Sequence, residues 1–122
     1  MKKKFTVNKI ICADSRELSN FIKPNSVALT VTSPPYRNAI NYSQHIKNTK
    51  SGKNKSFRGN EEVTLEQYLS DMEEIFSQVN KVTVPGGYCC IVIADELFEK
   101  NLIPLPSMLA SRLLNPDDEE NG

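Results

Sequence analysis

Four consecutive residues, Ser33-Pro34-Pro35-Tyr36, combine a hydroxyl group, two rigid imino acids and an aromatic ring. Proline holds φ at about −65°, pushes the preceding residue towards extended geometry and has no N–H to donate. The segment therefore presents hydroxyl and carbonyl oxygens as acceptors with few competing donors. Such acceptors beside a flat ring suit an exocyclic amino group on a planar heterocycle. Its amino hydrogens would bond to Ser33 Oγ and the Pro34 carbonyl, while the ring stacks on Tyr36.

A cationic stretch follows this motif. Residues 37–58 contain six Lys or Arg residues and no acid, although the net charge of the chain is zero. A local excess of positive charge indicates an anionic partner, with nucleic acid the leading candidate. A solvated loop is an equally good interpretation on composition alone. Asp117 to Glu120 are four consecutive acids, which predict an acidic, disordered tail over residues 115–122.

The motif and the first acidic residue should each follow a strand. Val7–Ala13 is predicted to be a short strand with Ile10 and Ile11 buried, and Val27–Thr32 is rich in β-branched residues and predicts a second strand. Between them, Asp14 and Ser15 are expected to cap a short helix that ends before Pro24.

The second half of the chain predicts a helix, a strand and a last short helix. Apolar residues recur at helical spacing over Leu65–Val82, and Thr64 with Gln67 fits a capping box. Pro85-Gly86-Gly87 ends this unit. The nearly continuous apolar run Tyr88–Ala94 predicts a strand covered on both faces, as in a parallel sheet. Ser107–Leu114 is expected to form the last helix.

This alternation predicts an α/β chain with a parallel sheet and right-handed crossovers. Three strands leave two open edges, so we expect the sheet to be incomplete and residues 1–114 to form part of a domain. Within that domain, residues 37–63 are expected to form a long, mobile, basic loop.

The totals are those of an ordinary globular protein. The chain has 122 residues, of which 39% are hydrophobic and 25% charged. No apolar run approaches the ~18 residues that span a bilayer, and the start lacks the apolar region of a signal peptide. Cys12, Cys89 and Cys90 do not suggest a disulfide framework, so we expect small core residues in a protein of the reducing cytoplasm. We predict no metal site.

The segments CADSREL and NSVALTVTSPPYRNAINY resemble the amino-directed DNA methyltransferases that modify cytosine N4 or adenine N6. The hallmark of that family is Asp/Asn/Ser-Pro-Pro-Tyr/Phe immediately after a strand, and the serine form is more similar to the cytosine-N4 branch. Pro85-Gly86-Gly87 and Ile103-Pro104-Leu105 also fit the family pattern. The resemblance extends over roughly residues 7 to 110 and implies a partial Rossmann-like, S-adenosylmethionine-dependent methyltransferase fold.

The resemblance implies direct methyl transfer from S-adenosylmethionine to the exocyclic amine of a base flipped out of double-stranded DNA. It assigns the catalytic motif to Ser33, Pro34, Pro35 and Tyr36, and contact with the cofactor to Asp14 and Ser15. Contacts with DNA are expected from Arg37, Asn38, Tyr42, Lys47, Lys50, Lys53, Lys55 and Arg58. No covalent intermediate is needed, so no catalytic cysteine is expected.

The family's second signature, a glycine-rich loop close to F-x-G-x-G that receives part of the cofactor, has no match in the sequence. In one branch of the family this loop lies far downstream of the proline motif. Two interpretations follow: a fragment or split subunit of a cytosine-N4 methyltransferase, completed by a second chain, or an inactive remnant with weak nucleic-acid binding. Adenine-N6 modification, or methylation of an amide or an RNA base, are further alternatives. The isolated chain is not expected to bind S-adenosylmethionine tightly.

Overall fold

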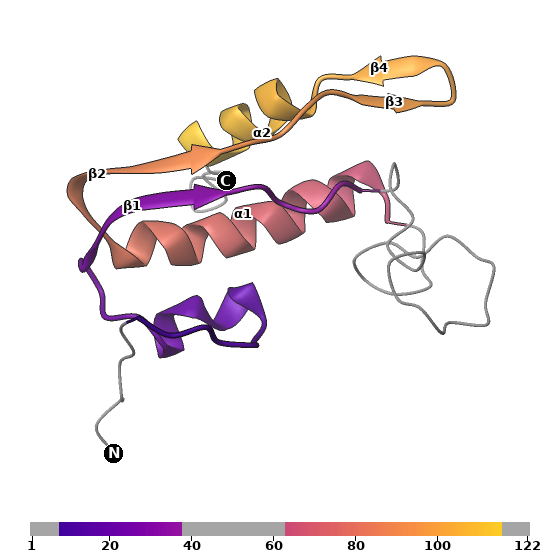
Figure 1. The fold of residues 1–122 in the computed structure, drawn as a ribbon. Helices are drawn as coiled ribbons and strands as arrows, with labels where there is room; N and C mark the ends of the chain where they lie inside the picture. Colours follow the sequence, from indigo (N-terminus) through magenta and orange to yellow (C-terminus); the bar gives the residue numbers. More distant parts are fainter. Residues whose placement is uncertain (1–7, 38–62, 116–122) are drawn as a thin grey trace, which may run out of the picture.

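The computed structural model describes residues 8–37 and 63–115. These residues form an α/β arrangement with two helices, two parallel strands and a hairpin (Figure 1). The elements are, in order, the 3₁₀ helix η1 (Ser15–Asn20), β1 (Val27–Thr32), α1 (Leu65–Val82), β2 (Thr83–Ile91), β3 (Glu96–Phe98), β4 (Asn101–Ile103) and α2 (Leu105–Leu114).

The two longer strands pair side by side. β1 is parallel to β2, with Leu29 opposite Tyr88 and Thr32 opposite Ile91. The pairing continues past the end of β2, because the Val92 N–H donates to the Thr32 carbonyl oxygen at 2.9 Å. The strand predicted at Val27–Thr32 is thus confirmed, and its carboxyl end lies beside the carboxyl end of β2.

Helix α1 has the predicted bounds and the predicted cap. The Thr64 side chain accepts a hydrogen bond from the Gln67 N–H at 3.1 Å, which satisfies one of the free donors of the first turn. One face of α1 is buried, including Tyr68, Met72 and Phe76. The apolar periodicity was sufficient to locate this helix because the pattern repeats over five turns of local sequence.

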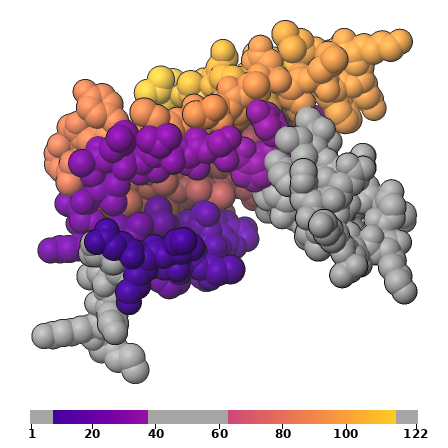
Figure 2. All heavy atoms as spheres, viewed as in Figure 1, coloured from indigo at the N-terminus to yellow at the C-terminus, as the bar shows by residue number. Residues whose placement is uncertain are grey.

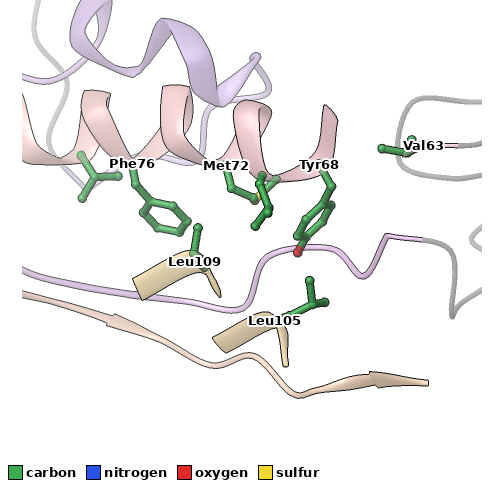
Figure 3. Close-up of a cluster of buried hydrophobic side chains, with 8 residues drawn as sticks. Val63, Tyr68, Met72, Phe76, Leu105 and Leu109 are labelled. Atoms are coloured by element: carbon green, nitrogen blue, oxygen red, sulfur yellow. The ribbon is translucent and has the colours of Figure 1, made fainter. Parts of the chain in front are cut away.

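The core lies where α1 and α2 pack together on one side of β1 and β2 (Figure 3). Tyr68, Met72 and Phe76 of α1 point towards Leu105 and Leu109 of α2. Burial of these apolar side chains contributes about 25 cal/mol per Å² of surface removed from water. α2 begins at Leu105, two residues before the predicted start, because Pro106 is compatible with the first turn of a helix.

The Pro85-Gly86-Gly87 segment belongs to β2 rather than preceding it. β2 begins at Thr83, and its register with β1 shifts between Val27 and Leu29. Gly86 has φ +82°, and a Cβ on Gly87 would lie 3.0 Å from the Ala28 carbonyl oxygen and 2.8 Å from Thr83 Cγ2. Glycine is therefore needed at both positions, one for backbone conformation and the other for close approach to β1.

A second, antiparallel sheet was not predicted. β3 and β4 form a hairpin that extends beyond the helices in Figure 1. Its two turn residues, Glu99 and Lys100, have φ of 48° and 65°. Two left-handed residues in succession give a turn whose twist matches that of the two strands, and Asn-Gly is the usual sequence in such a turn. Glu99-Lys100 is not a typical turn sequence, so the hairpin could not be predicted from it.

Two sequence-based predictions about strands are wrong. Residues 8–13 contain no strand, and Ile10 and Ile11 are exposed. An extended run needs a neighbouring strand for its N–H and C=O groups, and the described part of the chain offers none here. The parallel sheet therefore has two strands instead of three.

The prediction that the strand after Pro85-Gly86-Gly87 is covered on both faces is also wrong. Tyr88 and Val92 are 73% and 64% exposed. Cys12, Cys89 and Cys90, expected in the core, are exposed free cysteines. The error about the strand arises because described elements cover only the face of the sheet that meets α1 and α2, which leaves Tyr88, Cys90 and Val92 exposed on the other face.

Candidate functional site at the carboxyl end of β1

The Ser33–Tyr36 motif lies directly after the last residue of β1. Ser33 is exposed, and Pro34, Pro35 and Tyr36 are half-buried. Within residues 8–37 and 63–115, no donor is bonded to the Ser33 hydroxyl or the Pro34 carbonyl oxygen. Two acceptors therefore stand beside a tyrosine ring at the end of a parallel strand, which is where ligands bind in open α/β sheets.

Helix α1 supports the motif from within. The hydroxyl of Tyr68 donates a hydrogen bond to the Pro35 carbonyl oxygen at 2.9 Å. Tyr68 is fully buried, and Figure 3 shows its hydroxyl directed at the chain that follows β1. A buried donor of this kind fixes the position of the Pro35 carbonyl, because breaking the bond would leave polar atoms unsatisfied.

An ion pair anchors the residue that follows the motif. Nε and Nη2 of Arg37 donate to Oε2 of Glu96 at 3.0 and 2.9 Å, and Nη1 donates to the Val63 carbonyl oxygen at 3.2 Å. Arg37 and Glu96 are only 5% and 3% exposed. The guanidinium also lies 4.9 Å from the centroid of the Phe98 ring, a cation–π arrangement. The carboxyl end of β1 is thereby tied to the β3–β4 hairpin.

Glu96 is a site residue that sequence reasoning missed. Its only signal was an acid just beyond an apolar strand, and its partner lies 59 positions away. One oxygen, Oε1, is buried without a hydrogen-bond partner in the part of the chain that the structure describes. The cost of burying this carboxylate is offset by the two charge-assisted bonds from Arg37 to its other oxygen.

The predicted DNA-contacting residues are placed only in part. The structure puts the Arg37 guanidinium in the interior, where it holds the motif instead of facing solvent. The other predicted contacts, Asn38, Tyr42, Lys47, Lys50, Lys53, Lys55 and Arg58, lie outside the described residues, as does nearly all of the predicted basic loop.

Asp14 caps η1, as predicted, but it does not follow a strand. Its carboxylate accepts from the Arg16 N–H at 2.9 Å and pairs with Arg16 Nη2 at 2.7 Å. Side-chain and then backbone hydrogen bonds from Arg16 lower the pKa of Asp14 to about 2. Ser15, the first residue of η1, is exposed. Within the described part of the chain, no hydrogen bond or ion pair joins Asp14 to residues 33–37, so the structure does not link the two predicted subsites directly.

An open groove elsewhere on the molecule is distinct from the motif. It is lined by residues of α1, β2 and α2, among them Phe76, Val79, Cys89 and Leu113. Burial is the main cause that raises the pKa of the Cys89 thiol, and the neighbouring Cys90 adds to it. A raised pKa makes a thiol less nucleophilic at neutral pH, so this groove has no activated cysteine.

Two further findings concern the described residues alone. No group of three or more His, Cys, Asp or Glu side chains there is arranged to hold a metal ion. No helix in the same ranges has both the length and the apolar character needed to cross a bilayer.

The fold and the site are compatible with part of a methyltransferase: a small parallel sheet, helices packed on it, and a proline motif where β1 ends. The chain is 31% identical over 105 residues to the Type II beta methyltransferase M.BslI of Bacillus sp. (strain NEB-606). This match covers 86% of the chain but about a tenth of the length of M.BslI. No protein-family model matches the chain. The similarity supports a relationship to methyltransferases.

Proposed function

We propose that the chain is part of the catalytic domain of a Rossmann-like DNA methyltransferase that modifies the N4 amine of cytosine, as a fragment or split subunit. The observation that carries the proposal is a pair of acceptors, Ser33 Oγ and the Pro34 carbonyl, that have no donor among the described residues and stand beside Tyr36 at the carboxyl end of β1. The similarity to M.BslI supports it.

In the proposed mechanism, Tyr36 stacks on a cytosine that has been flipped from the duplex. Ser33 Oγ and the Pro34 carbonyl oxygen each accept a hydrogen bond from one N–H of the amino group. Its lone pair, delocalised into the ring in free cytosine, then becomes more available on nitrogen. Tyr68 and the Arg37–Glu96 pair hold these acceptors in place, so little rearrangement accompanies the reaction.

The methyl group would be supplied by S-adenosylmethionine. The residues described do not form a complete site for it. The sequence lacks a glycine-rich loop, and the Asp14 carboxylate proposed to contact the cofactor is already paired with Arg16. We therefore propose that polypeptide outside these 122 residues completes the cofactor site.

The lack of that loop also keeps an inactive remnant as the second candidate. A remnant would retain at most weak nucleic-acid binding. The two candidates differ in whether the motif still recognises a base, and this property can be measured without methyl transfer.

Binding to DNA with an extruded base tests the proposal. The 122-residue chain is titrated with a duplex in which one cytosine faces an abasic site, and with the fully paired duplex. Flipping costs least for an unpaired base, and one stacked base contributes about 1–3 kcal/mol. We expect roughly tenfold tighter binding to the abasic duplex, as judged by this stacking contribution.

Tyr36→Ala should abolish that preference. Tyr88→Ala, which removes an exposed tyrosine from β2 and leaves the motif untouched, is the matched control and should retain it. Equal binding of the two duplexes by the unmodified chain would favour the remnant.

A further inference from the structure

The side of the parallel sheet that faces away from α1 and α2 is apolar and open. Leu29 and Val31 of β1 are 57% and 66% exposed, and Tyr88 and Val92 are 73% and 64% exposed. Cys90 is also exposed, and because alternate residues of a strand share one face of the sheet, it lies on the same face as Tyr88 and Val92. We call these five residues the outer sheet face.

Strand register makes the outer sheet face continuous. Leu29 is opposite Tyr88 and Val31 is opposite Cys90. Their sequence neighbours Thr30, Thr32 and Ile91 are half-buried and point to the other side, towards the helices. In Figure 2 the atoms of β1, in purple, cross the front of the molecule with no other coloured element over them.

Such a face is unusual for a sheet of this type. Parallel sheets occur almost only with helices on both faces, because their strands are apolar on both sides. The outer sheet face contains no charged residue, and a contiguous apolar patch generally marks an interaction site. The apolar side chains and the parallel pairing both indicate that a layer is missing.

Three observations bear on what that layer is. The chain matches only about a tenth of M.BslI, so most of that methyltransferase lies outside the matching region. The sequence contains no glycine-rich loop for a cofactor. The outer sheet face belongs to β1 and β2, the strands whose carboxyl ends adjoin the Ser33–Tyr36 motif, so a polypeptide docked there would also reach the site.

We infer that the outer sheet face is the docking surface for the remaining polypeptide of the methyltransferase, which covers it with the apolar side of one or more helices. This inference rests on the proposed function. It assigns Leu29, Val31, Tyr88, Cys90 and Val92 to an interface that the chain alone leaves open.

The test is association of two polypeptides. The 122-residue chain is co-expressed with M.BslI from which the 105 matching residues have been removed, and complex formation is measured by size-exclusion chromatography with light scattering. We expect a one-to-one complex. The double variant Leu29→Ser/Val31→Ser should weaken it at least tenfold, because two exposed apolar side chains leave the interface.

Leu114→Ser is the matched control. Leu114 is 79% exposed but lies on α2, so its substitution should leave the affinity unchanged. Circular dichroism of each variant checks that the fold is retained, as expected when only exposed side chains change.

Absence of a complex with the unmodified chain would overturn the inference, as would equal weakening by Leu114→Ser. A homodimer of the chain alone that the double variant dissociates would also overturn it, by making a second copy the occupant. Methyl transfer is recorded separately. A complex that forms without methyl transfer contradicts the proposed function and supports the docking surface. Methyl transfer that persists when the double variant is used supports the proposed function and contradicts the docking surface.

Discussion

The Arg37–Glu96 ion pair shows at the residue scale how the motif is held. Both charges are nearly inaccessible to water, so each depends on the other. Removing one partner of a buried pair typically costs about 3–5 kcal/mol, because the remaining charge is left uncompensated in the interior. That cost is roughly a third or more of the stability of a typical domain.

Glu96→Gln should therefore lower the free energy of unfolding by about 3 kcal/mol, since Arg37 keeps a hydrogen-bond partner but loses its counter-charge. Urea denaturation measures this change. Glu99→Gln, in the exposed turn of the same hairpin, should change stability by less than about 0.5 kcal/mol. Comparable losses in both variants would show that the ion pair has no special role.

Asp14 provides a prediction about pH. Hydrogen bonds from Arg16 lower its pKa from 3.8 to about 2. A carboxyl group whose pKa is lower in the folded state stabilises that state at pH values above its ordinary pKa. That contribution is lost as the pH falls through about 2, the pKa of Asp14 in the folded chain. NMR titration of the carboxyl carbon should give a midpoint near this value.

Arg16→Ala should raise the midpoint without restoring the ordinary value, because the backbone N–H at position 16 still donates to Asp14. An unchanged midpoint would exclude the Arg16 side chain as the main cause of the shift.

At the scale of elements, local patterns were informative and long-range pairing was not. The α1 bounds, its Thr64 cap and β1 follow from periodicity and residue type within each segment. Residues 8–13 are as apolar as a strand but have no strand beside them in the described chain. Glu96 is the same kind of miss in the site, since its importance depends on Arg37 far away in sequence.

Gly87 tests the close contact between the two parallel strands. A methyl group there would lie within 3.0 Å of two backbone carbonyl oxygens, which cannot move without disturbing the ladder. Gly87→Ala should lower the free energy of unfolding by about 1–3 kcal/mol, the usual range for overpacking. Thermal denaturation followed by circular dichroism measures it. Ser77→Ala on the exposed side of α1 is the control, and equal melting temperatures for the two variants would contradict the predicted clash.

At the scale of the whole molecule, the sheet has one covered face, one open face and a motif at the end of β1. Because the sequence lacks a glycine-rich loop, we expect the isolated chain to bind S-adenosylmethionine more weakly than micromolar. Isothermal titration calorimetry tests this directly. Micromolar binding would mean that the 122 residues already contain the cofactor site.

The most direct test of the proposed reaction is a chimera in which this chain replaces the 105 matching residues of M.BslI. DNA from cells that express the chimera is digested and its nucleosides are analysed by mass spectrometry. We predict N4-methylcytosine, and its loss when Ser33→Ala removes one of the two amine acceptors. A chimera that folds and binds S-adenosylmethionine but produces no N4-methylcytosine, or whose product is unaffected by Ser33→Ala, would contradict the assignment of Ser33–Tyr36 as the cytosine-amine site.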